Sequence, residues 1–306
     1  MFEIVFLGTS ASAPSVHRGL SALLIQQEEF RFLVDCGEGT QRQILRSGVG
    51  FKRLNQVLLT HGHLDHILGL GGLVSTFLRW EVMEEIEIYG SQHTLDRVHD
   101  LLFGVVLRGH RGNSPVKLRV INPGKFFETE NFTITAFSVD HRGSSSLGYR
   151  LEERSRRPFL PEKAEVLQIP PGPWRRDLVN GLTVTLPDGR EIEPDQVLGE
   201  SREGTSLIVV GDTGNPKKLQ QYVQDADALV IEATYVQQEE DLARRFDHLT
   251  AAQAAELAKN ANVKELFLTH LSRRYREKDV FDEARAIFPN VHVARDFDSY
   301  QIRREN

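Results

Sequence analysis

Short apolar runs separated by turn signals recur from one end of this chain to the other. Runs of this length are typical of β-strands, and apolar residues at helical spacing fill several of the intervals between them. The expected strands are residues 3–7, 22–26, 32–34, 56–60, 85–89, 132–139, 147–151, 206–210, 228–232, 265–269 and 301–303, and the expected helices are residues 40–47, 67–80, 94–103, 216–223, 250–260 and 280–287. Strands mixed with helices over the whole length predict a layered domain of the α/β class.

The composition is that of an ordinary globular protein. With 306 residues, of which 40% are hydrophobic and 26% charged, the chain is long enough to bury a sizeable core. The formal net charge of −6 is weak evidence against a nucleic-acid partner, although a local basic surface can still dominate at one site. The single cysteine, Cys36, rules out an intrachain disulfide and a thiolate zinc site, so we expect a small core residue beside a strand end.

The N-terminal segment does not have the composition of a secretory signal. Ala11-Ser12-Ala13 provides the small residues of a cleavage site, but the preceding segment carries Glu3, lacks a basic region and has too short an apolar run. No stretch approaches the roughly 18 apolar residues of a membrane span. We therefore expect a cytoplasmic protein that has no membrane partner.

One segment, residues 152–199, interrupts the alternation with a composition rich in Pro, Gly and charged residues. It contains IPPGP and the stretch LTVTLPDGREIE, in which Asp188-Gly189 predicts a two-residue hairpin turn. A long insertion inside a compact domain is usually functional or a linker, although a tolerated surface excursion is the alternative. We interpret residues 1–306 as one domain from which an arm at residues 152–199 leaves and returns.

The hexapeptide His61-Gly62-His63-Leu64-Asp65-His66 places four potential metal ligands directly after an expected strand. Imidazole and carboxylate together suit zinc and related divalent ions. Because one residue separates them, His61 and His63 can point to the same side, while Asp65 and His66 are directed toward a second position. This density of ligands predicts a metal site.

Three further candidate ligands follow other apolar runs. Active sites of α/β folds form outside the carboxyl ends of strands, and His141, Asp212 and His270 each come just after an expected strand. Each residue alone is more often a turn or capping residue. Their common placement makes them candidates for the same site.

These residues resemble the metallo-β-lactamase superfamily and, within it, the ribonuclease Z family of tRNA 3′-processing endonucleases. The resemblance extends over FLGTSASAP, LVDCGEGTQRQ, LTHGHLDHILGL, GDT, DHLTAAQAAELA and THLSRRY, and it includes the IPPGP arm. It implies an αββα sandwich of two mixed sheets flanked by helices, with an inserted flexible arm that binds tRNA as an exosite. It also implies two Zn²⁺ ions per subunit, with other divalent ions such as Mn²⁺ as alternatives. One ion would be bound by His61, His63 and His141, the other by Asp65, His66 and His270, with Asp212 bridging both.

The resemblance also assigns catalytic roles. A pair of zinc ions would activate a shared water molecule near neutral pH and stabilise the charge of a phosphodiester. Asp65 would accept a hydrogen bond from the attacking water, and His248 would be the general acid that protonates the leaving oxygen. Without the resemblance, either His248 or Thr250 is the expected N-cap of helix 250–260. We further expect Glu232, at a strand end, to orient His248.

Substrate-binding residues are expected at three places. Ser272 and Arg274, just after His270, resemble the family's phosphate-contacting pair. Gly172 and Pro173, beside Trp174, are expected at an RNA-facing tip of the arm. Arg18 lies in a loop that reads P-x-K-x-R-N in the family and PSVHRG here, and this departure leaves open whether a CCA end prevents cleavage.

The resulting hypothesis is a zinc-dependent endoribonuclease that cleaves the 3′ trailer from precursor tRNA and leaves a 3′-hydroxyl on the tRNA. The resemblance also implies a homodimer, with helix 67–80 either at the subunit contact or packed on a sheet. The alternative is a small-molecule metallo-hydrolase on the same fold, such as a phosphodiesterase or lactonase, which the acidic net charge favours. A third alternative, an RNA- or protein-binding relative with an inactive site, is disfavoured by the complete set of ligand residues.

Overall fold

The computed structural model describes residues 1–80, 85–109 and 114–304. The chain divides into two compact units. The main unit consists of Met1–Glu152 and Thr205–Arg303, and the inserted unit consists of Glu153–Gly204 with Arg304. Each unit is described by itself below.

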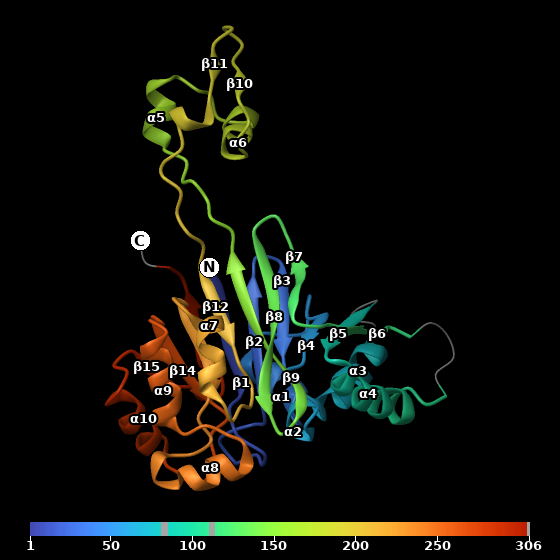
Figure 1. Cartoon of the computed structure of the whole chain (residues 1–306). Coiled ribbons are helices and arrows are strands. Elements are labelled where there is room, and N and C mark those ends of the chain that lie inside the picture. The colour runs from blue at the N-terminus through green and yellow to red at the C-terminus, as the bar shows by residue number, and fades with distance from the viewer. Residues whose placement is uncertain (81–84, 110–113, 305–306) are drawn as a thin grey trace. The chain divides into compact units, whose positions relative to one another are not determined.

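The main unit is built on two seven-stranded mixed sheets (Figure 1). In sheet order, the first contains β16 (Ser299–Ile302), β1 (Phe2–Gly8), β2 (Ala22–Gln27), β3 (Phe30–Val34), β4 (Gln56–Leu58), β5 (Ile86–Gly90) and β6 (Val116–Val120). The second contains β15 (Val291–Val293), β14 (Glu265–Thr269), β13 (Ala228–Glu232), β12 (Ser206–Val209), β9 (Ser144–Glu153), β8 (Phe132–His141) and β7 (Gly124–Glu128). The strands from β3 to β6 are parallel, as are those from β12 to β15.

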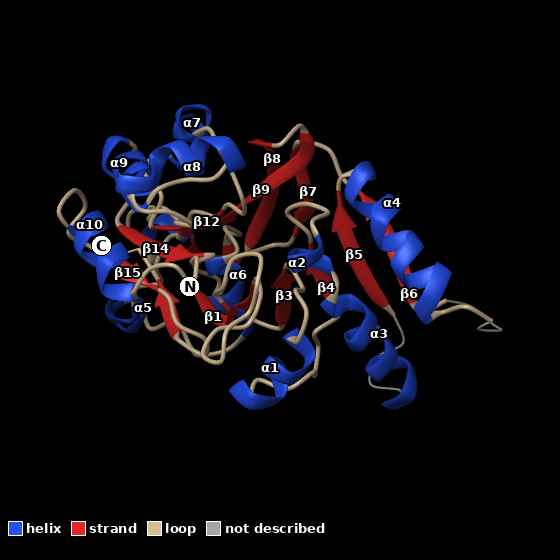
Figure 2. Ribbon diagram, turned by 90° about the horizontal axis from the view of Figure 1, so that it is seen from below, coloured by secondary structure: helices blue, strands red, loops and turns tan. Residues whose placement is uncertain are grey.

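Helices cover the outer face of each sheet (Figure 2). The first sheet is accompanied by α1 (Thr40–Ser47), α2 (Leu64–Ile67), α3 (Gly69–Trp80), α4 (Gln92–Leu101) and the π-helical turn η1 (Leu102–Val106). The second is accompanied by η3 (Pro216–Leu219), α7 (Gln220–Val223), η4 (Gln237–Glu239), α8 (Glu240–Phe246), α9 (Ala251–Asn260) and α10 (Glu277–Arg285). The predicted αββα sandwich is therefore confirmed.

Side chains that point alternately to the two faces of each strand explain this layering. Ile4 and Phe6 of β1 belong to the apolar core between the two sheets, whereas Val5 and Leu7 belong to the core beneath α1 and α3. A third core lies between the second sheet and α9 and α10. Since successive side chains of a strand point to opposite faces, strands buried on both faces must be apolar throughout. This is the origin of the short continuous apolar runs in the sequence.

Three strands, β6, β7 and β15, were not predicted, and all three are edge strands of their sheets. Edge strands are short and carry charged side chains, which weakens their sequence pattern.

The predicted helix 67–80 is interrupted at Leu68, where α2 ends and α3 begins. Thr250, and not His248, is the N-cap of α9, and it forms a capping box with Gln253. Cys36 is buried near the end of β3, two residues after Val34, as expected.

The inserted unit has a small core of its own. It contains α5 (Pro161–Val166), α6 (Pro173–Val179), the hairpin strands β10 (Val184–Thr185) and β11 (Glu191–Ile192), and η2 (Pro194–Gln196). The apolar cluster at its centre consists of Ala164, Ile169, Leu178, Val184, Leu186, Ile192 and Val197. The predicted hairpin is present. The backbone N–H of Leu186 donates to the carbonyl of Arg190, so the turn consists of the three residues 187–189 and is one residue longer than predicted. Gly189 accommodates this loop with a φ of +84°.

Among the residues that the structure describes, no helix combines the length and the apolar character needed to span a bilayer.

Candidate metal centre and active site

The structure brings together all seven side chains that the sequence suggested as ligands. His61 follows β4, His63 is the N-cap of α2, and Asp65 and His66 lie in α2. His141 ends β8, Asp212 follows β12 and His270 follows β14. They form two groups whose ligand atoms lie within 4.8 Å of one another. Both sheets thus contribute to one site at their strand ends.

The first group contains three histidines and Asp212. His61 Nε2 lies 3.0 Å from His63 Nδ1, and His141 Nε2 lies 3.4 Å from that same atom. Oδ2 of Asp212 lies 3.7 Å from His61 Nε2 and 3.9 Å from His141 Nε2. The four atoms face one common point.

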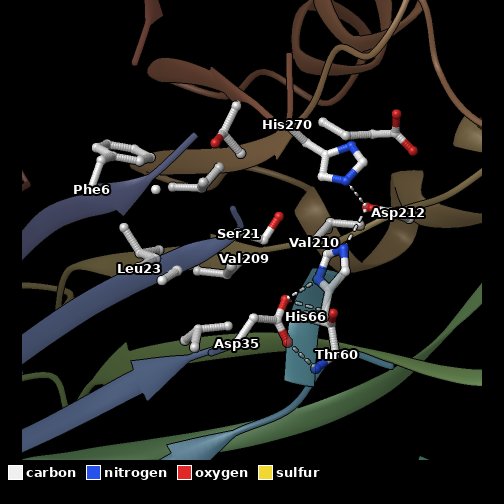
Figure 3. Close-up of a pocket in the computed structure, with 17 residues that line it drawn as sticks. Phe6, Ser21, Leu23, Asp35, Thr60, His66, Val209, Val210, Asp212 and His270 are labelled. Carbon is white, nitrogen blue, oxygen red and sulfur yellow. Dashed lines mark hydrogen bonds and ion pairs between the residues drawn. The ribbon is translucent and has the colours of Figure 1, made fainter. Parts of the chain in front are cut away.

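The second group contains Asp65, His66, His270 and, again, Asp212. Oδ1 of Asp212 lies 3.4 Å from His66 Nε2 and 3.3 Å from His270 Nε2 (Figure 3). Oδ2 of Asp65 lies 3.5 Å from His270 Nε2 and 3.8 Å from His66 Nε2. One oxygen of Asp212 therefore faces each group, which is the arrangement of a bridging carboxylate.

The inner nitrogen of four of these histidines is already hydrogen-bonded to an oxygen of the protein. The Nδ1 atoms pair as follows: His61 with Thr60 Oγ1 at 3.0 Å, His66 with Asp35 Oδ2 at 2.8 Å, His141 with the carbonyl of Asp247 at 2.8 Å, and His270 with Thr234 Oγ1 at 2.9 Å. These partners favour the tautomer in which Nδ1 carries the proton. Nε2 then presents its lone pair to the centre, as a metal ligand must.

Unpaired buried atoms show that the residues fit divalent cations. His66 Nε2, Asp212 Oδ1 and His270 Nε2 are buried and have no hydrogen-bond partner. Buried polar atoms are almost always paired in folded proteins, so three that face one another call for a cation between them. Two ligands of a tetrahedral zinc ion are roughly 3.3–3.4 Å apart, close to the separations found here.

The protonation states agree with ligation. Burial and the neighbouring imidazoles lower the pKa of His61 well below its ordinary value, and burial with the charge of His141 lowers that of His63 to about 4. Burial alone would raise the pKa of Asp212, but the charges of His270 and His66 hold it well below its ordinary value. Neutral imidazoles and an ionised carboxylate are the forms that coordinate cations.

His66 differs from the other ligand candidates. Burial alone would lower its pKa, but the carboxylates of Asp212 and Asp35 raise that pKa well above its ordinary value. Coordination through Nε2 requires the neutral imidazole, so cation binding at His66 is favoured as the pH rises.

Asp35 is a functional residue that the sequence analysis missed. Its Oδ1 accepts the backbone N–H of Thr60 at 2.8 Å, and its Oδ2 accepts the Thr60 hydroxyl at 2.8 Å and the Nδ1–H of His66. Figure 3 shows this carboxylate beneath His66. Asp35 directly follows the apolar run 32–34, so the rule that found the other strand-end residues would also have found it.

Glu232 organises the opposite side of the site. Its fully buried carboxylate accepts hydrogen bonds from His248 Nδ1 at 3.0 Å, Thr213 N at 2.7 Å, Thr234 Oγ1 at 2.5 Å and Leu249 N at 3.2 Å. Burial lowers the pKa of His248, but the charge of Glu232 and the hydrogen bond to it raise that pKa to about 9. The expected contact between Glu232 and His248 is thus present, and it keeps His248 protonated at neutral pH.

A cleft of about 640 Å³ opens beside the two ligand groups, and His63, Asp65, Asp212 and His248 are part of its lining. Four arginines also line it: Arg97, Arg142, Arg273 and Arg274. Among the described residues of the lining, the only carboxylates are the two ligand candidates. The smaller cavity of Figure 3, about 40 Å³, lies between the sheets beneath His66 and His270 and is too small for a nucleotide.

The predicted substrate-binding residues are distributed over different places. Ser272 and Arg274 line the cleft. Arg18 does not line it, because its guanidinium donates to Thr9 Oγ1 at 2.6 Å, to the carbonyl of Ala294 at 2.5 Å and to Glu277 Oε2 at 2.9 Å. In this arrangement Arg18 braces its own loop.

Gly172 and Pro173 belong to the inserted unit and begin α6. Gly172 has a φ of +125°, which other residues rarely adopt. Trp174 packs partly against the core of this unit, and the guanidinium of Arg175 donates to the carbonyl of Ile169 at 2.7 and 3.1 Å. Both side chains thus stabilise the IPPGP turn.

Comparisons with known proteins agree with this architecture. The chain is 47% identical over 302 residues to "Ribonuclease Z" of Bradyrhizobium sp. (strain ORS 278), covering 99% of this chain and 100% of that protein. It is 38% identical over 306 residues to "Ribonuclease Z" of Archaeoglobus fulgidus, covering 99% and 98%. The crystal structure of the short form of human tRNase Z has a TM-score of 0.66 at 25% identity, covering 98% of this chain and 99% of that chain.

Two further similarities are broader. The metallo-β-lactamase fold protein YhfI from Bacillus subtilis has a TM-score of 0.70 at 19% identity, covering 98% of each chain, and shows the fold alone. A family profile described as "Anti-Pycsar protein Apyc1" matches residues 2–156. That match includes the hexapeptide at 61–66 and His141 but ends before Asp212 and His270.

Proposed function

Because this chain belongs to the ribonuclease Z family and has the metallo-β-lactamase fold, we propose that it is the endoribonuclease that removes the 3′ trailer from precursor tRNA and leaves a 3′-hydroxyl. The observation that carries the proposal is a pair of ligand groups sharing Asp212 beside a cleft lined by arginines. Guanidinium groups match phosphate oxygens in charge and geometry. A neutral lactone or thioester has no comparable need for four such groups.

The two ligand groups would hold two divalent cations per subunit, for which zinc is the preferred occupant because the donors are imidazole and carboxylate. When bound, the cations supply Lewis-acid activation of water and neutralise charge on the phosphodiester. In keeping with its family, the enzyme is proposed to act as a homodimer.

The chain's own residues contribute proton transfer and orientation. Asp65 can accept a hydrogen bond from the attacking water as well as binding a cation. His248 is held by Glu232 through Nδ1, so Nε2–H is available to protonate the leaving ribose oxygen. The arginines of the cleft position the phosphodiester and balance its charge.

The inserted unit is proposed to be the tRNA-binding arm. It contains the IPPGP turn at residues 169–173, and it has a core separate from that of the main unit. Recognition of tRNA by shape and phosphate position requires little reading of bases. Such a unit would select tRNA without taking part in hydrolysis.

The test is digestion of one precursor tRNA by the zinc-loaded protein, with the cut site mapped on transcripts with and without an encoded CCA. We expect cleavage after the discriminator nucleotide. Deletion of residues 152–199 should abolish cleavage of precursor tRNA and spare hydrolysis of bis(p-nitrophenyl) phosphate. Unchanged processing by the deletion variant would refute the arm assignment.

The second candidate is a small-molecule phosphodiesterase. The specific observation in its favour is the formal net charge of −6, because a nucleic-acid backbone favours a basic partner. Hydrolysis of small diesters by intact protein that neither binds nor cleaves precursor tRNA would decide for this candidate.

A further inference from the structure

Two loops that carry site histidines run side by side at the cleft. The Nδ1–H of His141 donates to the carbonyl of Asp247, and the backbone N–H of Arg142 donates to the Asp247 carboxylate. The guanidinium Nε of Arg142 donates to the carbonyl of Phe246 at 3.0 Å. The ring centroids of His141 and His248 are 5.1 Å apart. The segment at the end of β8 therefore adds Arg142 to the cleft lining, and the segment at the end of α8 adds Phe246 and His248.

Among the described residues that line the cleft, the exposed large apolar side chains are Leu64 and Phe246, and of these Phe246 is aromatic. Its relative exposure is 36%, and it lies among the residues that line the cleft. The guanidinium carbons of Arg142 and Arg245 lie 5.6 and 5.5 Å from its ring centroid. The charge of Arg142 also reaches His248, whose pKa it lowers after the larger effects of burial and of the Glu232 and Asp212 carboxylates.

An aromatic ring with a guanidinium group packed over it is a typical surface for a nucleobase. Stacking on such groups occurs with every base, and it is commonly combined with a basic groove that follows the phosphates. The cleft already has the basic groove in Arg97, Arg273 and Arg274. Phe246 and Arg142 add the stacking surface.

The role of His248 in the proposed reaction decides which nucleotide lies at the surface formed by Phe246 and Arg142. In the proposed reaction water attacks phosphorus, the bond from phosphorus to O3′ of the preceding nucleotide breaks, and His248 donates its proton to that O3′. The ribose of the nucleotide on the 5′ side of the cut must therefore lie at His248. Phe246 and His248 line the same cleft. Arg142, whose guanidinium carbon lies 5.6 Å from the Phe246 ring centroid, directly follows His141, whose ring centroid lies 5.1 Å from that of His248. We therefore assign the base of that nucleotide to Phe246.

We propose that Phe246 and Arg142 form a stacking platform for the base on the 5′ side of the cut, and that this platform places O3′ at His248. The inference rests on the proposed function and assigns a specificity-determining role within the same site.

The test is a double-mutant cycle between Phe246→Ala and an abasic nucleotide on the 5′ side of the cut. With wild-type enzyme, removal of that base should lower kcat/KM by roughly five- to a hundredfold, the range for loss of one base–aromatic stack. Phe246→Ala should cause a similar loss on the intact precursor tRNA and little further loss on the abasic one. Phe246→Tyr should restore most of the activity, because it keeps the ring.

Phe281→Ala is the matched control. Phe281 also lies beneath a guanidinium, that of Arg285 at 5.3 Å, but on α10 and outside the cleft lining. This variant should keep the wild-type sensitivity to the abasic substitution. The unfolding temperature and metal content of each variant report on folding independently of activity.

The proposal of a stacking platform would be contradicted if the losses in kcat/KM caused by Phe246→Ala and by the abasic substitution multiply when the two changes are combined. It would also be contradicted if wild-type enzyme cleaved the abasic precursor as fast as the intact one. Wild-type enzyme that cleaves no precursor tRNA at all would instead contradict the proposed function. The two failures are therefore distinguishable.

Discussion

His248 Nδ1 lies 3.0 Å from Oε1 of Glu232, a carboxylate that is completely buried behind the ligand groups. This contact orients the imidazole and favours its charged form, the two requirements for a general acid.

Replacement of His248 by Ala should therefore lower kcat for precursor tRNA by roughly 10²- to 10⁴-fold, the usual contribution of general acid catalysis. A diester whose leaving group departs without a proton, such as bis(p-nitrophenyl) phosphate, should be affected much less. Glu232→Gln should show the same contrast with smaller losses. Equal losses on both substrates would show that His248 does not act as a proton donor.

Removal of the cations should abolish activity and lower stability together. The second group brings the buried Asp212 carboxylate and two unpaired imidazole nitrogens close to one another, so bound cations stabilise the native state. Dialysis against a chelator should eliminate cleavage and reduce the unfolding temperature, and added Zn²⁺ should restore both. Elemental analysis should find about two ions per chain, a stoichiometry implied by the two donor groups.

Asp212→Asn should reduce the content of both ions, because one carboxylate faces both groups. His63→Ala, which affects only the first group, should retain an ion in the second. Loss of a single ion on replacement of Asp212 would rule out a bridging role.

Thr234→Val should weaken metal binding without removing a ligand. The Thr234 hydroxyl donates to Glu232 and accepts the Nδ1–H of His270, and it therefore fixes the His270 ring. Loss of such a supporting hydrogen bond usually costs roughly 10- to 100-fold in metal affinity. The measurement is competition for Zn²⁺ with a chelating dye, and Thr185→Val, at an exposed position on β10, is the control.

Gly214→Ala should destabilise the site loops. A Cβ at this position would lie 1.8 Å from Oδ1 of Asp247, whose carbonyl holds His141. Overpacking of this kind costs about 1–3 kcal/mol, so the unfolding temperature and the activity should both fall. Gly104→Ala is the matched control, because nothing lies within 4 Å of its added Cβ. Similar behaviour of the two variants would contradict the close packing.

Much of the candidate site was predictable because it obeys local rules. Ligands that follow apolar runs lie at strand ends, and strand ends meet at one edge of a sheet. This reasoning selected His141, Asp212 and His270, and it would have selected Asp35 if it had been applied to the run 32–34 as well. The edge strands β6, β7 and β15 were missed because charge and short length obscure their pattern.

The sequence by itself determined the layered fold and the set of side chains available for cations, because apolar periodicity and ligand chemistry are local properties. Only the tertiary structure decided that one oxygen of Asp212 faces each group, that Arg18 braces a loop, and that Phe246 lies beside Arg142 in the cleft. These relationships join segments far apart in the chain; Arg142 and Phe246, for example, are separated by 104 positions. Their geometry is fixed by how strands and helices pack in the folded chain, and no local pattern of residues encodes that packing.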